Sequence, residues 1–257
     1  MEISIIINNY KTRGLLKQCL GGIFMYPPAV DYEVIVVDNN SQDGSVELVK
    51  EKFPNVKLIA SNENLGFHKG NNLGIRNSTG KYILISNTDI AVKDDSIDKI
   101  YRFMEEHPEA ALVGPKLKNP DGSIQMSCLR FPGPMVPIYR RTILGKLPFA
   151  KKEIDNYLMT DFDHQITREV DWILGAFMMI RRSAIEKVGL MDESLFLYFG
   201  DVAWCQKFKA VNYKVYYYAE TDIVHYHKRE SAQSGVFSKI FWIHIMDWFR
   251  YLKKYSL

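Results

Sequence analysis

The sequence predicts an α/β fold in which helices flank a mostly parallel sheet. Four short apolar runs in the first third are rich in β-branched residues and are separated by segments with helical spacing. Each run stops at a cluster of amide, hydroxyl or carboxylate side chains. The runs and their endings are Ile3–Ile7 with Asn8-Asn9-Tyr10, Val34–Val37 with Asp38-Asn39-Asn40, Val56–Ala60 with Ser61-Asn62, and Tyr82–Ile85 with Ser86-Asn87-Thr88-Asp89. Because ligands of open α/β sheets bind beyond the carboxyl ends of the strands, these endings predict one site.

The composition is that of an ordinary globular protein. The 257 residues are 47% hydrophobic and 25% charged, which suits one large domain or two small ones. The net charge of +3 is too small to indicate a nucleic-acid partner. Cys19, Cys128 and Cys205 are far apart and lack metal-ligand spacing, so we expect reduced thiols in a cytoplasmic protein. We expect no signal peptide, because the first residues lead directly into a strand without a basic region followed by an apolar stretch. We expect no membrane span, because no window approaches 18 uninterrupted apolar residues.

The elements follow in order along the first half. Helices are predicted near residues 12–25, 43–53, 66–78 and 94–106, and a short strand at Ala111–Val113. Residues 119–165 differ, because four prolines are expected to interrupt any regular structure: Pro132, Pro134, Pro137 and Pro148. The same stretch is basic. It is either a solvated loop or a mobile segment over an anionic acceptor, and both interpretations stay open.

The second half returns to regular structure. A turn and buried strand are predicted over Val170–Ile180, a helix over Arg182–Val188, a helix over Asp201–Ala210 and a strand over Lys214–Tyr218. Residues 236–257 have aromatic and apolar positions at helical spacing among basic ones. We favour an amphipathic helix in a membrane interface. The alternative is a helix that packs on the rest of the chain or on a second subunit of a homodimer.

The strand endings carry chemistry suited to a nucleotide and a metal. The carboxylate of Asp38 can accept the imide N–H of uracil or thymine, or it can cap the following helix. Asp89, beside the amide of Asn87, suits a hard divalent cation that also takes phosphate oxygens, or it can form an Asx turn. His225 and His227 follow the last predicted strand, where either could ligate a metal or hold a phosphate.

Two further segments add binding and catalytic groups. Asn62–Asn72 places amides, glycines and a basic pair at a strand-to-helix junction, which favours phosphate or carbohydrate. This segment is neither a Walker loop nor a G-x-G-x-x-G fingerprint. Asp201 follows the aromatic run Phe196–Phe199, so burial should raise its pKa into the range of a general base. The same aspartate can also be a helix N-cap.

Together these motifs resemble the GT-A fold glycosyltransferases of family 2, especially the bacterial rhamnosyltransferase-like branch. The match runs from Ile3 to about Ser231 and is specific only in combination. It rests on Asn9-Tyr10, Val36–Ser41, Asn64–Asn72, Asn87-Thr88-Asp89, Gly175–Phe177, Arg181-Arg182, Val188–Glu193 and Phe196–Asp201. The resemblance implies a GT-A domain over residues 1–235, with a nucleotide-sugar-binding half (1–115) and an acceptor-binding half (116–235), followed by the amphipathic helix 236–257.

The resemblance also implies roles for single residues. Asp201 is expected to be the catalytic base of an inverting transfer. Asp89, with His225, is expected to hold Mg²⁺ or Mn²⁺ on the donor diphosphate. The donor is expected to contact six residues: Asn9, Asp38, Asn64, Gly66, Asn71 and Asn87. The leading donor is dTDP-rhamnose, and the acceptor is expected to be a glycan or a polyprenyl-diphosphate-linked sugar in cell-surface polysaccharide synthesis.

Two departures from the family pattern keep other functions open. The D-x-D motif is Asn87-Thr88-Asp89, and the Glu-Asp pair before the last helix is Gly200-Asp201. A non-catalytic sugar-nucleotide-binding homologue is therefore an alternative. A nucleotidyltransferase is a weaker one, since the loop after the first strand has a single glycine, Gly14. Release of nucleoside diphosphate, of pyrophosphate, or of neither distinguishes the three.

Overall fold

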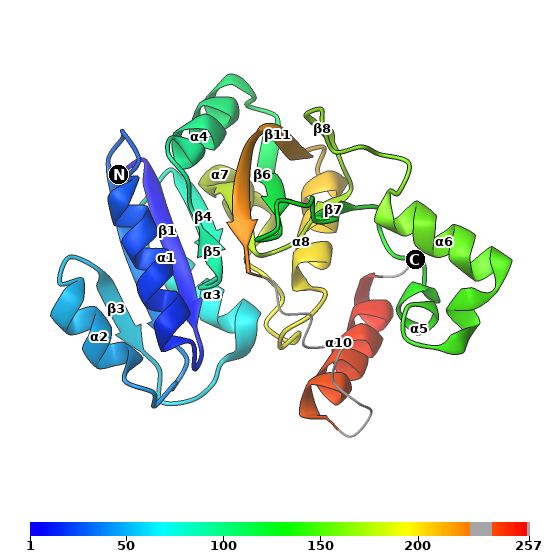
Figure 1. The fold of residues 1–257 in the computed structure, drawn as a ribbon, viewed down its shortest axis with the longest axis horizontal. Helices are drawn as coiled ribbons and strands as arrows, with labels where there is room; N and C mark the ends of the chain where they lie inside the picture. The colour runs from blue at the N-terminus through cyan, green and yellow to red at the C-terminus, as the bar shows by residue number, and fades with distance from the viewer. Residues whose placement is uncertain (227–237, 256–257) are drawn as a thin grey trace.

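The computed structural model describes residues 1–226 and 238–255 (Figure 1). Within these residues nine strands form one sheet, in the order β3-β2-β1-β4-β10-β6-β11-β5, with β8 paired to β11. The strands of this sheet are β1 (Ile3–Asn9), β2 (Tyr32–Asp38), β3 (Lys57–Ala60), β4 (Tyr82–Ser86), β5 (Ile90–Ala91), β6 (Ala110–Lys118), β8 (Arg168–Glu169), β10 (Phe177–Arg181) and β11 (Lys214–His225). A separate small sheet pairs β7 (Cys128–Leu129) with β9 (Trp172–Ile173).

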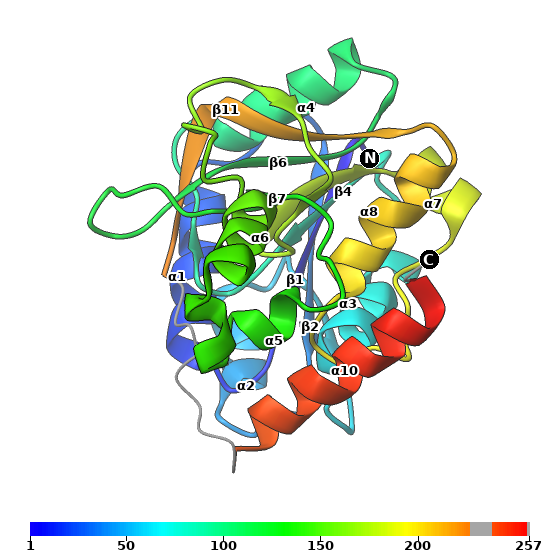
Figure 2. The same ribbon diagram turned by 90° about the vertical axis from the view of Figure 1, so that its right-hand side faces the viewer.

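Helices cover both faces of the large sheet. They are α1 (Arg13–Met25), α2 (Ser45–Lys52), α3 (Gly66–Arg76), α4 (Ser96–Glu106), α5 (Val136–Tyr139), the 3₁₀ helix η1 (Ile143–Lys146), α6 (Pro148–Leu158), α7 (Arg182–Val188), α8 (Gly200–Ala210) and α10 (Lys239–Tyr255). Figure 2 shows α1 on one side of the strands and α3, α7 and α8 on the other. The mixed α/β fold and the helices predicted in the first half are confirmed.

The continuous apolar runs follow from burial on both faces. Along β1, Ile3, Ile5 and Ile7 pack into one core, while Ile6 packs into the other. Strands β1, β2 and β4 are parallel, with Asn9 beside Asp38 and Ile7 beside Ser86 in the register. Their polar endings therefore come out at one edge of the sheet, as predicted from the sequence.

The antiparallel strand β10 brings a later segment to this edge. β10 lies between β4 and β6 and runs against both, with Phe177 beside Ser86. The residues that precede β10 therefore lie next to the end of β4. The predicted strand over 170–180 is in fact split, because Leu174–Ala176 form a turn between β9 and β10.

The expectation that residues 119–165 lack regular structure is wrong. Pro137 and Pro148 lie in the first turns of α5 and α6, where a missing N–H removes no helical hydrogen bond. Ala150 and Tyr157 are buried on α6. The prolines in this stretch thus start helices as well as interrupt the chain.

The predicted C-terminal helix is present as α10, and it packs on the remainder of the chain. Trp248 is 6% exposed and Tyr251 is 1% exposed. Both belong to the same hydrophobic core as the buried residues of α8. The predicted boundary at residues 235 and 236, and His227, lie outside the described residues. In the part of the chain that the structure describes, no helix has the length and apolarity to span a membrane.

Candidate functional site

The end of β2 fixes a buried carboxylate. Asn9 Nδ2 donates to Asp38 Oδ1 at 2.7 Å, and the backbone N–H of Ser41 donates to Asp38 Oδ2 at 3.0 Å. Asn9 also accepts from the hydroxyl of Thr12 at 2.8 Å. Asn9 therefore orients Asp38, and direct contact between Asn9 and a donor stays a prediction.

Asp38 lies in the wall of a small polar pocket beyond β2 and β3. The pocket has a volume of about 230 Å³. Its lining residues are Asp38, Asn40, Gln42, Gly44, Ser45, Val46, Glu47, Ala60 and Ser61. Because whole small-molecule sites measure roughly 300–1,000 Å³, this pocket suits one ring of a nucleotide better than a complete nucleotide sugar.

The loop that enters α3 is held by its own amides and by a later loop. Asn64 Oδ1 accepts from the N–H of Gly66 at 2.9 Å, and Asn71 Nδ2 donates to Phe67 O at 2.9 Å. Gly66 has a φ of +77°, and a Cβ there would lie 2.4 Å from the carbonyl oxygen of Phe196. Glycine is therefore required where this loop meets the residues that precede α8.

Asn8 and Asn39 fasten the same loop to the strand ends. Both donate to the carbonyl of Gly66 at 3.0 Å, and Asn39 also donates to Asn8 Oδ1 at 2.8 Å. Asn71 is fully buried. In this structure Asn64, Gly66 and Asn71 brace the loop, and their contact with a donor stays a prediction.

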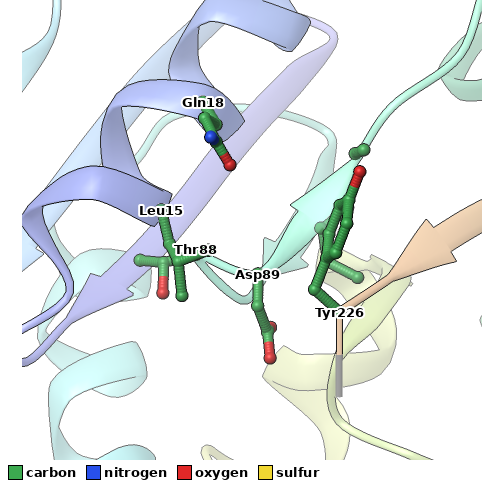
Figure 3. Close-up of a pocket in the computed structure, with 7 residues that line it drawn as sticks. Leu15, Gln18, Thr88, Asp89 and Tyr226 are labelled. Atoms are coloured by element: carbon green, nitrogen blue, oxygen red, sulfur yellow. The ribbon is translucent and has the colours of Figure 1, made fainter. Parts of the chain in front are cut away.

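The end of β4 places a carboxylate against an imidazole. Asp89 follows β4 and is partly exposed, and its Oδ1 lies 3.4 Å from Nε2 of the buried His225, the last residue of β11. The backbone N–H of Tyr226 donates to Asp89 O at 2.8 Å. Figure 3 shows Asp89 between Thr88 and Tyr226, at a pocket of about 250 Å³. The structure thus joins the two residues predicted to hold a metal.

Gln125 fixes which nitrogen of His225 faces Asp89. Gln125 Nε2 donates to His225 O at 2.9 Å and to Asn119 Oδ1 at 2.7 Å, so Gln125 Oε1 accepts from Nδ1–H of His225 at 2.9 Å. With the Nδ1 proton fixed in this way, Nε2 is the nitrogen that faces the carboxylate oxygen and that is available to a metal when it carries no proton. Both atoms would serve as ligands of a divalent cation, and a partner on the other ring nitrogen is the usual support of a metal-binding histidine.

Among the described residues no three His, Cys, Asp or Glu side chains gather at one point. A cation at Asp89 would therefore take its remaining ligands from water and from phosphate oxygens. Mg²⁺ is commonly bound in this way, through one or two carboxylates and a substrate phosphate.

Asp201 lies in the first turn of α8 and is locked by backbone donors. Its Oδ2 accepts from the N–H of Gly175 at 3.0 Å, and its Oδ1 accepts from the N–H of Val202 at 2.9 Å. Burial raises the pKa of this carboxyl above its ordinary value, although His68 and the two N–H donors oppose the shift. A carboxylate with a raised pKa is suited to proton transfer.

The turn before β10 links Asp201 to the end of β4. Gly175 donates to Asp201, and the next residue, Ala176, accepts from the N–H of Asn87 at 2.8 Å. Two consecutive residues therefore connect the predicted base to the segment that carries Asp89. Asn87, whose N–H makes this bond, is half-buried.

The departure at Gly200 has a steric explanation. A Cβ on Gly200 would lie 2.1 Å from Cδ2 and Nε2 of His68. His68 is 1% exposed, and its Nδ1 donates to Leu195 O at 2.7 Å. The imidazole of His68 therefore fills the space that a side chain at position 200 would need, and burial lowers its pKa so that the neutral ring is favoured.

A glutamate at position 200 should therefore be tolerated only when His68 is shortened. Gly200→Glu is expected to destabilise the fold by about 1–3 kcal/mol, the usual cost of overpacking, and His68→Ala should recover most of that loss. Urea unfolding of the two single variants and the double variant measures the coupling. Gly14→Glu is the control, since nothing lies within 4 Å of its Cβ position. If the changes in the free energy of unfolding caused by His68→Ala and Gly200→Glu simply add in the double variant, the steric explanation is wrong.

The sequence contains little or no indication that two residues, His68 and Gln125, support the site. His68 stands inside the Asn62–Asn72 segment, but nothing in that segment indicates that it meets Gly200. Gln125 lies in the proline-rich stretch, 100 residues from its partner His225, so only the fold shows the pairing.

The chain is similar in sequence to known glycosyltransferases. The family model for glycosyl transferase family 2 matches residues 4–189, more than half of the chain. An N-acetylglucosaminyl-diphospho-decaprenol L-rhamnosyltransferase of Mycobacterium tuberculosis H37Rv is 27% identical over 214 residues, which cover 77% of this chain and 67% of that protein. The rhamnosyltransferase WbbL of Escherichia coli K12 is 23% identical over 237 residues, which cover 87% of this chain and 83% of that protein.

A solved structure shows the same fold. The mannosyltransferase PcManGT from Pyrobaculum calidifontis, in complex with GDP-Man and Mn²⁺, has a TM-score of 0.61 at 18% identity and covers 99% of this chain and 70% of its own. The strand order, the match of the family model and this structural likeness lead to one conclusion: the chain belongs to glycosyltransferase family 2 and has the GT-A fold.

Proposed function

We propose that the chain is an inverting, metal-dependent glycosyltransferase that moves a sugar from a nucleoside diphosphate donor to an acceptor hydroxyl. The observation that carries the proposal is the link through Gly175 and Ala176, which connects Asp201 to the segment of Asp89. Asp201 would take the proton of the acceptor hydroxyl. Asp89 and His225 would hold Mg²⁺ or Mn²⁺, which neutralises the charge that develops on the departing diphosphate.

dTDP-rhamnose is the proposed donor. Two facts support it: the similar proteins of M. tuberculosis and E. coli are rhamnosyltransferases, and Asp38 offers an acceptor for the imide N–H of a thymine ring. The pocket beside Asp38 would take the base. The sugar would then extend along the sheet edge toward Asp89.

A glycan on a polyprenyl diphosphate is the proposed acceptor. The M. tuberculosis relative acts on an N-acetylglucosaminyl-diphospho-decaprenol. In this chain α5 ends next to the exposed Arg140, whose guanidinium lies 5.3 Å from the ring centre of Tyr157. A cation on this segment suits an anionic acceptor, which favours the second of the two interpretations of residues 119–165.

Transfer with a panel of nucleotide sugars tests the proposal. Purified protein is incubated with Mn²⁺ or Mg²⁺, each donor and a short-chain polyprenyl diphosphate carrying N-acetylglucosamine, and nucleoside diphosphate is measured. Release that depends on the acceptor and is largest with dTDP-rhamnose is the expected result. Release of pyrophosphate would indicate a nucleotidyltransferase, and donor binding without any release would indicate a non-catalytic homologue.

We also propose a peripheral position on the inner face of the cell membrane, and an exposed apolar stripe supports it. On the outer side of α10, Trp242, Met246 and Phe249 are 55%, 47% and 61% exposed, and Ile143 in η1 is 77% exposed. Basic residues accompany this stripe on α10, so an anionic lipid surface is the proposed partner.

Trp242→Ser with Phe249→Ser should therefore abolish flotation with anionic liposomes while nucleotide affinity is unchanged. Met25→Ser on α1, where the methionine is 69% exposed, is the control and should float normally. If the unsubstituted protein stays at the bottom of the gradient, the stripe does not meet lipid. A change from dimer to monomer in the double variant would then assign it to a homodimer.

A further inference from the structure

The loop that leads into Asp201 is bonded to two distant parts of the chain. On one side the start of α3 holds it: Phe67 N donates to Phe196 O at 2.7 Å, and His68 Nδ1 donates to Leu195 O at 2.7 Å. On the other side α10 holds it, and Figures 1 and 2 show α10 beside the segment that enters α8. Residues 195–199 thus connect the start of α3, the base and the C-terminal helix.

The hydrogen bonds from α10 to this loop come from a buried carboxylate, and the rings of His244 and Tyr251 pack beside it on Phe199. Asp247 is 0% exposed, and it accepts from three consecutive backbone N–H groups: Phe196 at 3.1 Å, Leu197 at 2.8 Å and Tyr198 at 3.1 Å. Arg250, which is half-exposed, adds an ion pair at 3.3 Å. Three amides that point at one carboxylate form an anion-binding concavity, here filled by a side chain of the same protein.

Packing alone does not explain an aspartate at this position. Trp248 and Tyr251 already bury the inner face of α10, and burying a carboxylate is costly unless hydrogen bonds satisfy it. An apolar residue would dock the helix without burying a charge, but it would leave the three backbone N–H groups without this acceptor. What the carboxylate provides in addition is one fixed conformation for the backbone of residues 196–198.

The fixed loop ends in an unfavourable conformation immediately before the base. Phe199 has a φ of +66°, which is rare for a residue with a side chain, and the next residues are Gly200 and Asp201. Tyr251 stacks on Phe199 at 5.3 Å between ring centres. Such a conformation persists only when the surrounding contacts hold it in place. Here the stacking of Tyr251 and the hydrogen bonds to Asp247 are those contacts.

We propose that Asp247 is a positioning residue: by holding the amides of residues 196–198, it sets where Asp201 lies relative to the start of α3. This inference rests on the proposed function, since it assigns a catalytic consequence to the loop. Through Asp247, α10 gains a role in positioning the base in addition to its exposed face. An error of about 1 Å in placing a catalytic group can cost about 10²-fold in rate.

Asp247→Asn tests the proposal, because the side chain keeps its size and loses the charge and one of its two acceptor oxygens. We expect kcat for transfer to fall by about 10²-fold while KM for the donor changes less than threefold. Amide hydrogen exchange should show faster exchange at residues 196–198. Both measurements are made at a temperature where every variant is folded.

Two control variants on α10 separate positioning from stability. Trp248→Leu removes buried packing, and Lys254→Ala removes the 2.8 Å ion pair with Asp192, yet neither residue bonds to residues 196–198. Both controls should lower the melting temperature, keep kcat within threefold and leave the 196–198 amides protected. The proposal is overturned if Asp247→Asn loses no more kcat than Trp248→Leu, or if its 196–198 amides stay protected.

The exchange measurement also separates this inference from the proposed function. If no donor supports transfer by the unsubstituted protein, the proposed function fails. Loss of protection at 196–198 in Asp247→Asn alone would still show that Asp247 orders the loop, and unchanged protection would refute the inference independently of any activity.

Discussion

Asp201→Asn is expected to lower the rate of sugar transfer by about 10²–10⁴-fold and to leave donor affinity nearly unchanged. An asparagine keeps the size of the side chain and can still accept from the N–H of Gly175 or Val202, so the local backbone should hold. It cannot take a proton from the acceptor hydroxyl. Single-turnover transfer measures the chemical step, and calorimetry with the nucleoside diphosphate measures donor affinity.

The pH dependence of transfer follows from the direction of the Asp201 pKa. Burial raises the pKa of this carboxyl, and a base is active only when it is deprotonated. Transfer should therefore be slow at low pH and rise with pH through a value above that of an ordinary aspartate. In Asp201→Asn this rise should be absent from the residual rate.

Asp161→Asn is a matched control for this substitution. Asp161 is 70% exposed and pairs only loosely with Arg130, at 3.5 Å. Its replacement should leave both the rate and the pH profile as they are. Near-normal turnover in Asp201→Asn would move the role of base to another residue.

The polar endings of the strands made the location of the site predictable from the sequence. Parallel strands that are buried on both faces appear as unbroken apolar runs, so their ends are easily recognised at Asn9, Asp38 and Asp89. Asp201 was identified by its place after an aromatic run. Asn9, Asp38 and Asp89 do lie at one edge of the sheet, and Asp201 on α8 is hydrogen-bonded to the turn before β10. Their roles toward a donor and a metal are still predictions.

The rest of the site depends on contacts between distant segments. The pairing of Gln125 with His225, the packing of His68 on Gly200 and the bonds from Asp247 to residues 196–198 each join residues far apart in the sequence. No periodicity or motif encodes such pairings. The prolines misled the prediction for residues 119–165, because proline both interrupts helices and begins them.

The C-terminal helix shows how one amphipathic pattern allows two interpretations. The helix α10 has two apolar faces. One is buried and includes Trp248 and Tyr251, and the other is exposed and includes Trp242 and Phe249. The membrane interpretation and packing on the domain are therefore compatible. Removal of residues 236–257 is now expected to impair catalysis as well as flotation, because it removes Asp247.

Removing the divalent cation is expected to abolish transfer, and Asp89→Ala is expected to have nearly the same effect at any metal concentration. Asp89 Oδ1 faces Nε2 of His225 at 3.4 Å, and this pair would contribute the protein's share of the coordination sphere. Without the cation, the charge on the departing diphosphate is not neutralised. Mn²⁺ titrations followed by electron paramagnetic resonance, with and without nucleoside diphosphate, measure the binding directly.

The support that Gln125 gives to His225 predicts a graded series of metal affinities. Asp89→Ala should weaken Mn²⁺ binding most, and His225→Ala should follow. Gln125→Leu should weaken binding by about 10–100-fold, the usual effect of losing a hydrogen bond behind a metal ligand. Asp222→Asn, on the same strand as His225 but paired with Lys93 and Lys118, is the control and should bind Mn²⁺ normally. Full transfer activity in excess EDTA would rule out the metal site. Equal affinities for His225→Ala and the unsubstituted protein would remove His225 from it, and an unchanged affinity in Gln125→Leu would remove the supporting role of Gln125.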